Sequence, residues 1–233
     1  MGKKEKPQEK VGGLVFFLSL FFLLILNGLL LLLVPTIFSG DHLLRNWTYF
    51  VLGGALGYVS SSILITGRLA VFLHELNHKV LSGLLGNKPK KLKVGQDDGF
   101  FEYEYTKETA PYNAFISLAP YFFPLFTLLT LTIALINWRS VHHIAVLITG
   151  LGYGADLYLN TKTISPHQSD FSQLNGGYFV GILYVILISA AIFFFLASWV
   201  SAGSLGVVNL FKTMFRIFAA LVQIFGGIQI SIP

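Results

Sequence analysis

The sequence contains no cysteine, and only 12% of its 233 residues are charged. The absence of cysteine excludes a disulfide framework and any metal site built on thiolates. The charged fraction is about half of the ~25% found in soluble domains. Acidic residues are the scarcer sign, with 11 Asp and Glu against 16 Lys and Arg, for a net charge of +5. This excess fits basic loops that face anionic lipid, and we expect no nucleic-acid partner.

The chain is instead rich in apolar residues. They make up 54% of the chain, and Phe alone occurs 22 times. Runs of ~18 apolar residues or more, long enough to cross a bilayer, recur along the sequence. We therefore expect an all-α, polytopic integral membrane protein with about six transmembrane helices, plus or minus one. Spans are expected near 14–35, 48–66 and 178–200.

The order of apolar and polar stretches divides the chain into four segments. These are a charged tail (1–10), a first span with its loop (11–47), a membrane-embedded core (48–200) and a C-terminal span or interfacial helix (201–233). Within the core, KKLKV and FFEYEYT each alternate on either side of the turn-like GQDDG, which predicts a small β-hairpin over 90–106.

The lysines of the tail and of the hairpin both favour the cytoplasmic side of the membrane. Both can lie there only if an even number of crossings separates them. A helix break at Gly67 would give three crossings. We therefore expect either that the helix after Gly67 is re-entrant or that one of the expected spans ends elsewhere.

The motif His-Glu-Leu-Asn-His at 74–78 lies inside one of the apolar stretches. On a helix its two histidines, four residues apart, share one face, and two imidazoles so placed can hold one Zn²⁺. Glu75 can then take a proton from water at the metal. Charged groups at bilayer depth are costly and indicate a functional site. We expect His74 and His78 to be metal ligands and Glu75 to be the catalytic base.

A catalytic zinc site needs a third protein ligand. Most of the acidic residues lie in the tail or in the hairpin. Asp170, in PHQSDFSQL just before a strong span, is the favoured candidate, because a ligand at a polar break can reach into the core. Asp156, in GYGAD, is the second. The remaining alternatives are Asp41 in the first loop, His142, His143 and His167.

Taken together, these residues resemble the site-2 protease family of intramembrane zinc metalloproteases. The resemblance covers about 68–177, from RLAVFLHELNHKVLSGLLGNKPKKLKV through ISLAPYFFPLF to SPHQSDF. It implies a zinc endopeptidase that cuts peptide bonds in or near the membrane. His74, His78 and Asp170 would be the zinc ligands and Glu75 the general base. Asn77 stands where the family usually has a glycine.

The implied partners are a transmembrane or membrane-anchored protein substrate and the lipid bilayer. The hairpin could hold a substrate by strand addition, or could cap the site or bind the membrane surface. Asn113 or Asn160 could donate to the oxyanion.

Two other functions use the same residues. One is a catalytically inactive relative that binds membrane peptides. The other is a metal or proton transporter in which the two histidines, Asp156 and Asp170 form a relay. The sequence shows no internal repeat, which disfavours the transporter.

Overall fold

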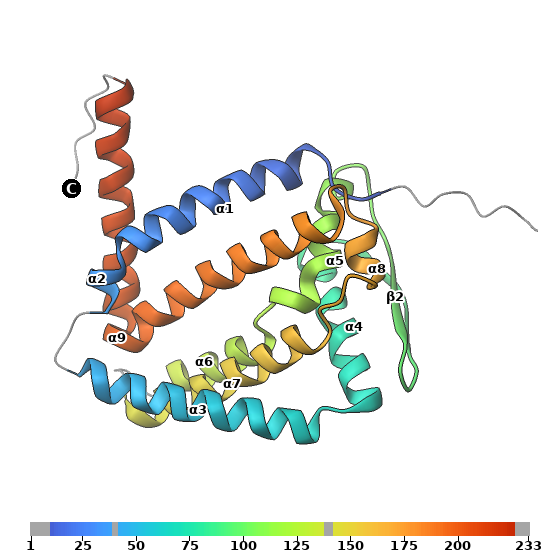
Figure 1. Cartoon of the computed structure of the whole chain (residues 1–233), viewed down its shortest axis with the longest axis horizontal. Coiled ribbons are helices and arrows are strands. Elements are labelled where there is room, and N and C mark those ends of the chain that lie inside the picture. Colours follow the sequence, from blue (N-terminus) through green and yellow to red (C-terminus); the bar gives the residue numbers. More distant parts are fainter. Residues whose placement is uncertain (1–9, 39–41, 138–141, 227–233) are drawn as a thin grey trace, which may run out of the picture.

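The computed structural model describes residues 10–38, 42–137 and 142–226 (Figure 1). The charged tail expected at 1–10 therefore lies outside the described residues except for Lys10, as does the end of the C-terminal segment from 227 onward. The described chain is mostly helical, with one two-stranded sheet.

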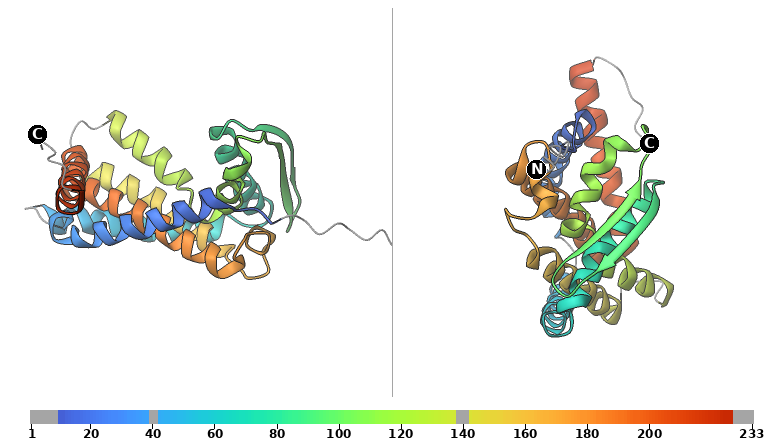
Figure 2. Two further views of the ribbon diagram at one scale, coloured as in Figure 1. Left: turned by 90° about the horizontal axis from the view of Figure 1, so that it is seen from above. Right: turned by 90° about the vertical axis from the view of Figure 1, so that its right-hand side faces the viewer.

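Several long helices run side by side along the length of the molecule (Figures 1 and 2). They are α1 (Leu14–Leu32), α3 (Leu43–Leu64), α7 (His143–Lys162) and the first part of α9 (Gly177–Gly226), with the short α2 (Val34–Ile37) between α1 and α3. Among the described residues, 2 helices are long and apolar enough to cross a membrane, or up to 4 if each bent pair is one span. The molecule thus has the features of a multi-pass membrane protein, with fewer qualifying helices than the six expected.

Glycines allow α3 and α7 to pack at very short range. Gly53 and Gly57 are four residues apart on α3, and a β-carbon on either would collide with the backbone of α7. Gly150 and Gly154 repeat the spacing on α7 and meet the backbone of α3 in the same way. Small residues at this spacing let membrane helices approach closely, where packing replaces the hydrophobic effect as the driving force.

A sharp bend separates α3 from α4 (Gly67–Leu84), the helix that carries the His-Glu-Leu-Asn-His motif. The two helices meet at 118°. Gly67 has a φ of +50°, a conformation that glycine adopts without strain. The carbonyl of Ile65, the residue that follows α3, accepts hydrogen bonds from Lys162 Nζ (3.2 Å) and Tyr158 Oη (3.4 Å), both on α7. The expected helix break at Gly67 is confirmed, and α7 fixes its geometry.

The bend also bears on the expected positions of the two groups of lysines. The first described residues, the hairpin and α4 all lie at one end of the molecule (Figure 1). The chain runs to the opposite end along α1 and returns along α3, after which α4 turns across that end. Two lengthwise passes therefore separate the N-terminal segment from the hairpin, because α4 does not make a third.

The hairpin is confirmed, with bounds slightly different from 90–106. Strand β1 (Lys88–Val94) pairs antiparallel with β2 (Gly99–Glu104), and a bulge lies between Pro89 and Lys91. Lys90 forms an ion pair with Glu104 at 3.0 Å. A short 3-10 helix, η1 (Ala110–Tyr112), leads from the sheet back into the helical part of the molecule.

The proline-rich apolar stretch forms two helices that meet at 73°, α5 (Asn113–Phe122) and α6 (Leu125–Asn137). Pro124 lies in the break between them, as expected for a residue that cannot donate a backbone hydrogen bond. The start of α6 is capped from another helix: Asp156 on α7 accepts from the backbone N–H groups of Phe126 (2.9 Å) and Thr127 (2.7 Å). It also accepts from the Thr127 hydroxyl at 2.7 Å.

The short helix α8 (Ser169–Ser172) stands between α7 and α9 and is held from the N-terminal segment. Val11 forms an isolated parallel bridge with Leu174, in which Val11 N donates to Gln173 O (2.8 Å) and Asn175 N donates to Val11 O (2.9 Å). The side chains of Phe171 and Leu174 are fully buried. The segment that carries Asp170 is therefore fixed by both backbone and side-chain contacts.

The glycine packing of α3 against α7 gives the first testable prediction. Gly57→Leu should lower the free energy of unfolding by about 1–3 kcal/mol or more, because the new side chain has no space and must push α7 away. Gly28→Leu on α1 is the control, since a β-carbon there meets nothing within 4 Å. Thermal unfolding of both variants in the same detergent checks this. Equal midpoints for the two variants would contradict it.

Candidate metal centre

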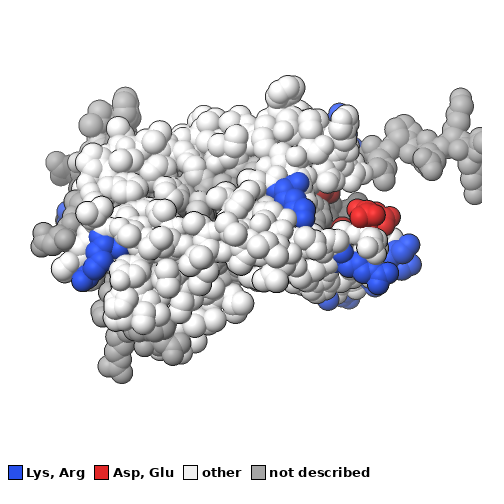
Figure 3. Space-filling model, turned by 60° about the horizontal axis from the view of Figure 1, so that its bottom comes forward, with Lys and Arg blue, Asp and Glu red and all other residues white. Residues whose placement is uncertain are grey.

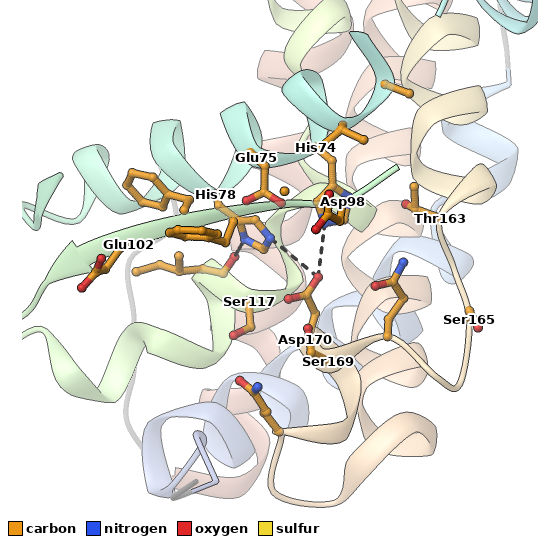
Figure 4. Close-up of a pocket in the computed structure, with 18 of the residues that line it drawn as sticks. His74, Glu75, His78, Asp98, Glu102, Ser117, Thr163, Ser165, Ser169 and Asp170 are labelled. Carbon is orange, nitrogen blue, oxygen red and sulfur yellow. Dashed lines mark hydrogen bonds and ion pairs between the residues drawn. The ribbon is translucent and has the colours of Figure 1, made fainter. Parts of the chain in front are cut away.

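The two motif histidines point from α4 toward the same place. His74 and His78 lie one helical turn apart, and their rings are 5.1 Å apart at an interplanar angle of 78°. The structure brings Asp170 to them from α8, although Asp170 lies 96 residues after His74 in the sequence. Figure 4 shows the three side chains converging, with dashed lines from each imidazole to the carboxylate.

The two distances from the imidazoles to the carboxylate are short enough for the three groups to share one metal ion. His74 Nε2 and His78 Nε2 lie 3.3 Å and 3.6 Å from Asp170 Oδ2. Ligand atoms about 2.0–2.1 Å from a tetrahedral Zn²⁺ lie about 3.3–3.4 Å from one another. One ligand atom from each residue falls within 4.8 Å of the others. The group could therefore hold a metal ion.

The protonation of His78 also favours a cation at this place. Its Nδ1 lies 2.6 Å from the carbonyl oxygen of Ile116, which can only accept, so Nδ1 carries a proton. In the neutral ring, Nε2 then presents its lone pair to the carboxylate oxygen of Asp170. Two acceptors face each other unfavourably unless a cation or a second proton lies between them. A backbone carbonyl that fixes the tautomer in this way is usual behind a metal-binding histidine.

Asp170 is held as a carboxylate. Burial raises its pKa, but hydrogen bonds and charge interactions with His74 and His78 outweigh burial, so the pKa lies well below the ordinary value of an aspartic acid. Tyr121 on α5 also donates from its hydroxyl to Asp170 Oδ2, at 2.8 Å. Tyr121 is 1% exposed, and its ring packs against Phe171 at 4.6 Å, so the hydroxyl has little freedom to move.

The metal group opens onto a cavity of about 880 Å³. Its walls come from α4, from the hairpin, from α5 and from the segment around α8. Glu75 is 6% exposed and lines the cavity beside the histidines. Gly99, the first residue of β2, is so close that a β-carbon on it would lie 3.0 Å from Glu75 Cγ and 2.6 Å from Val71 Cγ1. A side chain at Gly99 would therefore push the hairpin away from Glu75.

The described residues that were alternative candidates for the third ligand lie away from the two motif histidines. Asp156 caps α6, as described above, with both carboxylate oxygens already bonded. The rings of His142 and His143 contact each other at the start of α7, a helix of 20 residues and about 30 Å whose end, at Lys162, lines the cavity. His167 is exposed and is not one of the described residues that line the cavity. Asp41 lies outside the described residues.

The structure also separates the two asparagines considered as oxyanion donors. Asn113 lines the cavity, and its Oδ1 accepts from the hydroxyl of Tyr103 at 3.3 Å, which leaves the amide N–H groups available. The amide of Asn160 instead faces backbone carbonyls, and in the orientation that these require its nitrogen donates to Pro120 O (3.0 Å) and Asp156 O (3.3 Å). Asn77 is only 2% exposed, and the histidines on either side of it still converge.

Sequence reasoning missed two residues that support the group, Tyr121 and Ile116. Tyr121 lies in the quoted ISLAPYFFPLF segment, but a tyrosine between apolar residues carries no signal that distinguishes it from a core aromatic residue. Ile116 contributes only its backbone carbonyl, to which no sequence motif corresponds.

Comparisons with known proteins identify no relative: no protein-family model, no curated protein and no solved structure matches the chain.

The placement of the two aspartates predicts opposite behaviour of their variants. Wild type should bind about one zinc per chain, and Asp170→Ala should bind none, because two histidines alone do not complete a site. Asp156→Ala should keep its zinc but unfold more easily, by about 1–3 kcal/mol, since the backbone N–H groups at the start of α6 lose their acceptor. Elemental analysis and thermal unfolding of detergent-purified protein check both. Zinc lost with Asp156→Ala and kept with Asp170→Ala would reverse the assignment.

The hydrogen bond from Tyr121 predicts a weaker metal site when the hydroxyl is removed. Tyr121→Phe should lower zinc affinity by about 10-fold or more, because outer hydrogen bonds of this kind orient the ligand. Tyr184→Phe is the control, since this buried tyrosine packs in the same apolar cluster without contacting the metal group. Competition with a chelator of known affinity measures the difference. Equal affinities for the two variants would show that the hydroxyl does not support the site.

Proposed function

We propose that the protein is a membrane-embedded zinc metalloprotease that hydrolyses peptide bonds of membrane-spanning or membrane-proximal proteins. The observation that carries the proposal is the convergence of His74, His78 and Asp170, whose ligand atoms lie within 4.8 Å of one another, with Glu75 beside them on one cavity wall. The chemistry that zinc supplies when bound there is polarisation of a peptide carbonyl and a lowered pKa of water. The three ligands leave a fourth position for water or substrate.

Glu75 is the proposed general base. It directly follows His74 on α4 and lines the cavity. It is not one of the three residues whose ligand atoms converge, so its carboxylate is left for proton transfer. Its carboxylate takes a proton from the attacking water as the oxygen–carbon bond forms. It then returns the proton to the amine nitrogen as the carbon–nitrogen bond breaks. The low exposure of Glu75 keeps bulk water from competing for this proton.

Asn113 is the proposed donor to the oxyanion. Its amide group reaches the cavity from the first residue of α5, and the Tyr103 hydroxyl fixes its orientation by occupying Oδ1. A fixed N–H group aimed at developing negative charge costs no reorganisation during the reaction. Asn160 is less suited to this role because its amide already bonds backbone carbonyls.

The hairpin is the proposed holder of the substrate. A helical substrate must unwind before its carbonyls can be attacked, and an extended segment needs partners for its exposed backbone. The sheet has only two strands, so each strand keeps one unpaired edge, and the residues of β2 line the cavity from Gly99 to Tyr103. Pairing with such an edge supplies hydrogen bonds that do not depend on substrate sequence.

Glu75→Gln tests the proposal directly. It should retain zinc but lose at least ~10²-fold in cleavage rate, because the amide cannot accept the proton of water. The assay uses single-span membrane proteins tagged at both ends and reconstituted with the purified enzyme. Glu108→Gln is the matched control, because Glu108 is an exposed glutamate outside the cavity. Its rate should equal that of wild type.

The two ways in which this experiment can fail have different meanings. Wild type purified without chelator and free of zinc would exclude the metalloprotease. Wild type with zinc, but with cleavage no faster than Glu75→Gln on every substrate, would favour the relative that binds membrane peptides without cutting them.

A further inference from the structure

The helix α9 is interrupted within its 50 residues. Ala202 (φ −144°, ψ 17°) and Gly203 (φ 63°, ψ −149°) leave the helical conformation, and the second pair of angles is accessible essentially only to glycine. Gly206 lets the chain pass close to the backbone carbonyl of Ser198 at the corner. A straight helix of this length would reach about 75 Å against an apolar bilayer core of ~30 Å. The two parts of α9 are therefore separate units.

The second part of α9, residues 204–226, runs across the long direction of the molecule. The first part lies alongside α1 and α3, whereas the second part runs at a steep angle to these helices (Figures 1 and 2). It lies at the end opposite the hairpin and the candidate metal centre. If α1 and α3 cross the bilayer, this part of α9 is oriented along the membrane surface.

Residues 204–226 present three different stripes. The first faces the protein: Leu210 is buried, and Met214 and Ile217 pack with it in the apolar cluster that includes Leu30 of α1 and Leu33, which follows α1. The second stripe is apolar and exposed, with members three or four positions apart and 45–58% accessible: Val208, Phe211, Phe215 and Phe218.

The third stripe is polar and contains Asn209, Lys212, Thr213 and Arg216. Lys212 and Arg216 are exposed and four residues apart, on the same side of the helix. From Phe171 to the C-terminus the sequence contains no Asp or Glu, so no carboxylate on this helix can pair with them. Their charge is complementary to the phosphate groups of phospholipids.

We infer that residues 204–226 form a surface helix that lies in the headgroup region of the bilayer. Phe211, Phe215 and Phe218 enter the acyl boundary, and Lys212 and Arg216 bind headgroup phosphates. A helix with a buried, an apolar and a basic stripe has this preferred position at an interface. As a transmembrane helix it would instead place both cations near the centre of the bilayer, which is costly.

Figure 3 supports the same placement from the surface of the whole molecule. On the face shown, most charged side chains lie at the end with the hairpin, and a broad uncharged surface separates them from a few basic side chains at the opposite end. Arg45, in the first turn of α3, belongs to that opposite end. The uncharged surface has the character of a membrane belt, and Figure 1 places residues 204–226 at the end of the molecule opposite the hairpin.

Site-directed spin labelling can test the inference on the full chain. The native sequence has no cysteine, so single variants label at one position only. Nitroxides at Val208, Asn209, Phe211, Thr213 and Phe215 would be measured in phosphatidylcholine liposomes with and without phosphatidylglycerol. The accessibility of each nitroxide to oxygen and to a water-soluble nickel complex reports its depth in the bilayer. We expect nickel accessibility at Asn209 and Thr213, and oxygen accessibility at a shared shallow depth for the other three.

Two other patterns would overturn the surface helix. Depth that increases steadily from residue 208 to 215 would indicate a transmembrane helix. Apolar positions inaccessible to both reagents would indicate that a protein, such as a second copy of the chain, covers the stripe. Labelling by a membrane-impermeant maleimide is an independent measurement, with reaction expected at Asn209 and Thr213 but not at Phe211.

The phosphate contacts have their own test. Replacing Lys212 and Arg216 together by leucine should move the nitroxide at Phe211 deeper into the bilayer. The conservative pair Lys212→Arg with Arg216→Lys should leave its depth unchanged. An unchanged depth in the leucine variant would contradict the phosphate contacts. None of these measurements depends on zinc or on protease activity, so their outcome is separate from that of the proposed function.

Discussion

The carboxylate of Asp170 is the contact on which the rest of the candidate centre depends. One of its oxygens lies within 3.6 Å of both motif histidines and accepts from Tyr121, so it joins α4, α5 and α8 at one point. A buried carboxylate with several charge-assisted partners is stable only when all of them are in place, because each unsatisfied group costs free energy. The backbone bridge at Val11 and the buried ring of Phe171 keep the carboxylate there.

The parts that could be predicted from the sequence are those that depend on local patterns. The spacing of His74 and His78 requires only that 67–84 be helical, and the alternation around GQDDG requires only a turn. Asp170 could be ranked above the other candidates because it stands in a polar break near a helix start. Tyr121 could not be identified, since a hydroxyl donor in an apolar stretch acquires its role only from tertiary contact. The role of Asp156 was hidden for the same reason, because its partners lie 29 and 30 residues away.

The bends were harder to predict than the helices. Gly67 and Pro124 mark two breaks, but a break in the sequence does not define an angle. The angle after α3 is fixed by Lys162 and Tyr158, which bond the carbonyl of Ile65 from a helix more than ninety residues later. The sequence separates 178–200 from the C-terminal segment 201–233, but it does not decide whether that segment crosses the membrane or lies in the interface. The length of an apolar helix therefore does not by itself show whether that helix crosses the membrane or lies along its surface.

The separation of the ligands along the chain constrains when the centre can form during biosynthesis. His74 and Asp170 are 96 residues apart. At about 5–20 residues per second, a ribosome needs roughly 5–20 seconds to pass from one to the other. During that interval the two histidines are already in the nascent chain without their carboxylate partner, and α7, which fixes the bend before α4, is still being made. The metal group therefore assembles only when most of the helices have been synthesised and the surrounding protein can enclose it.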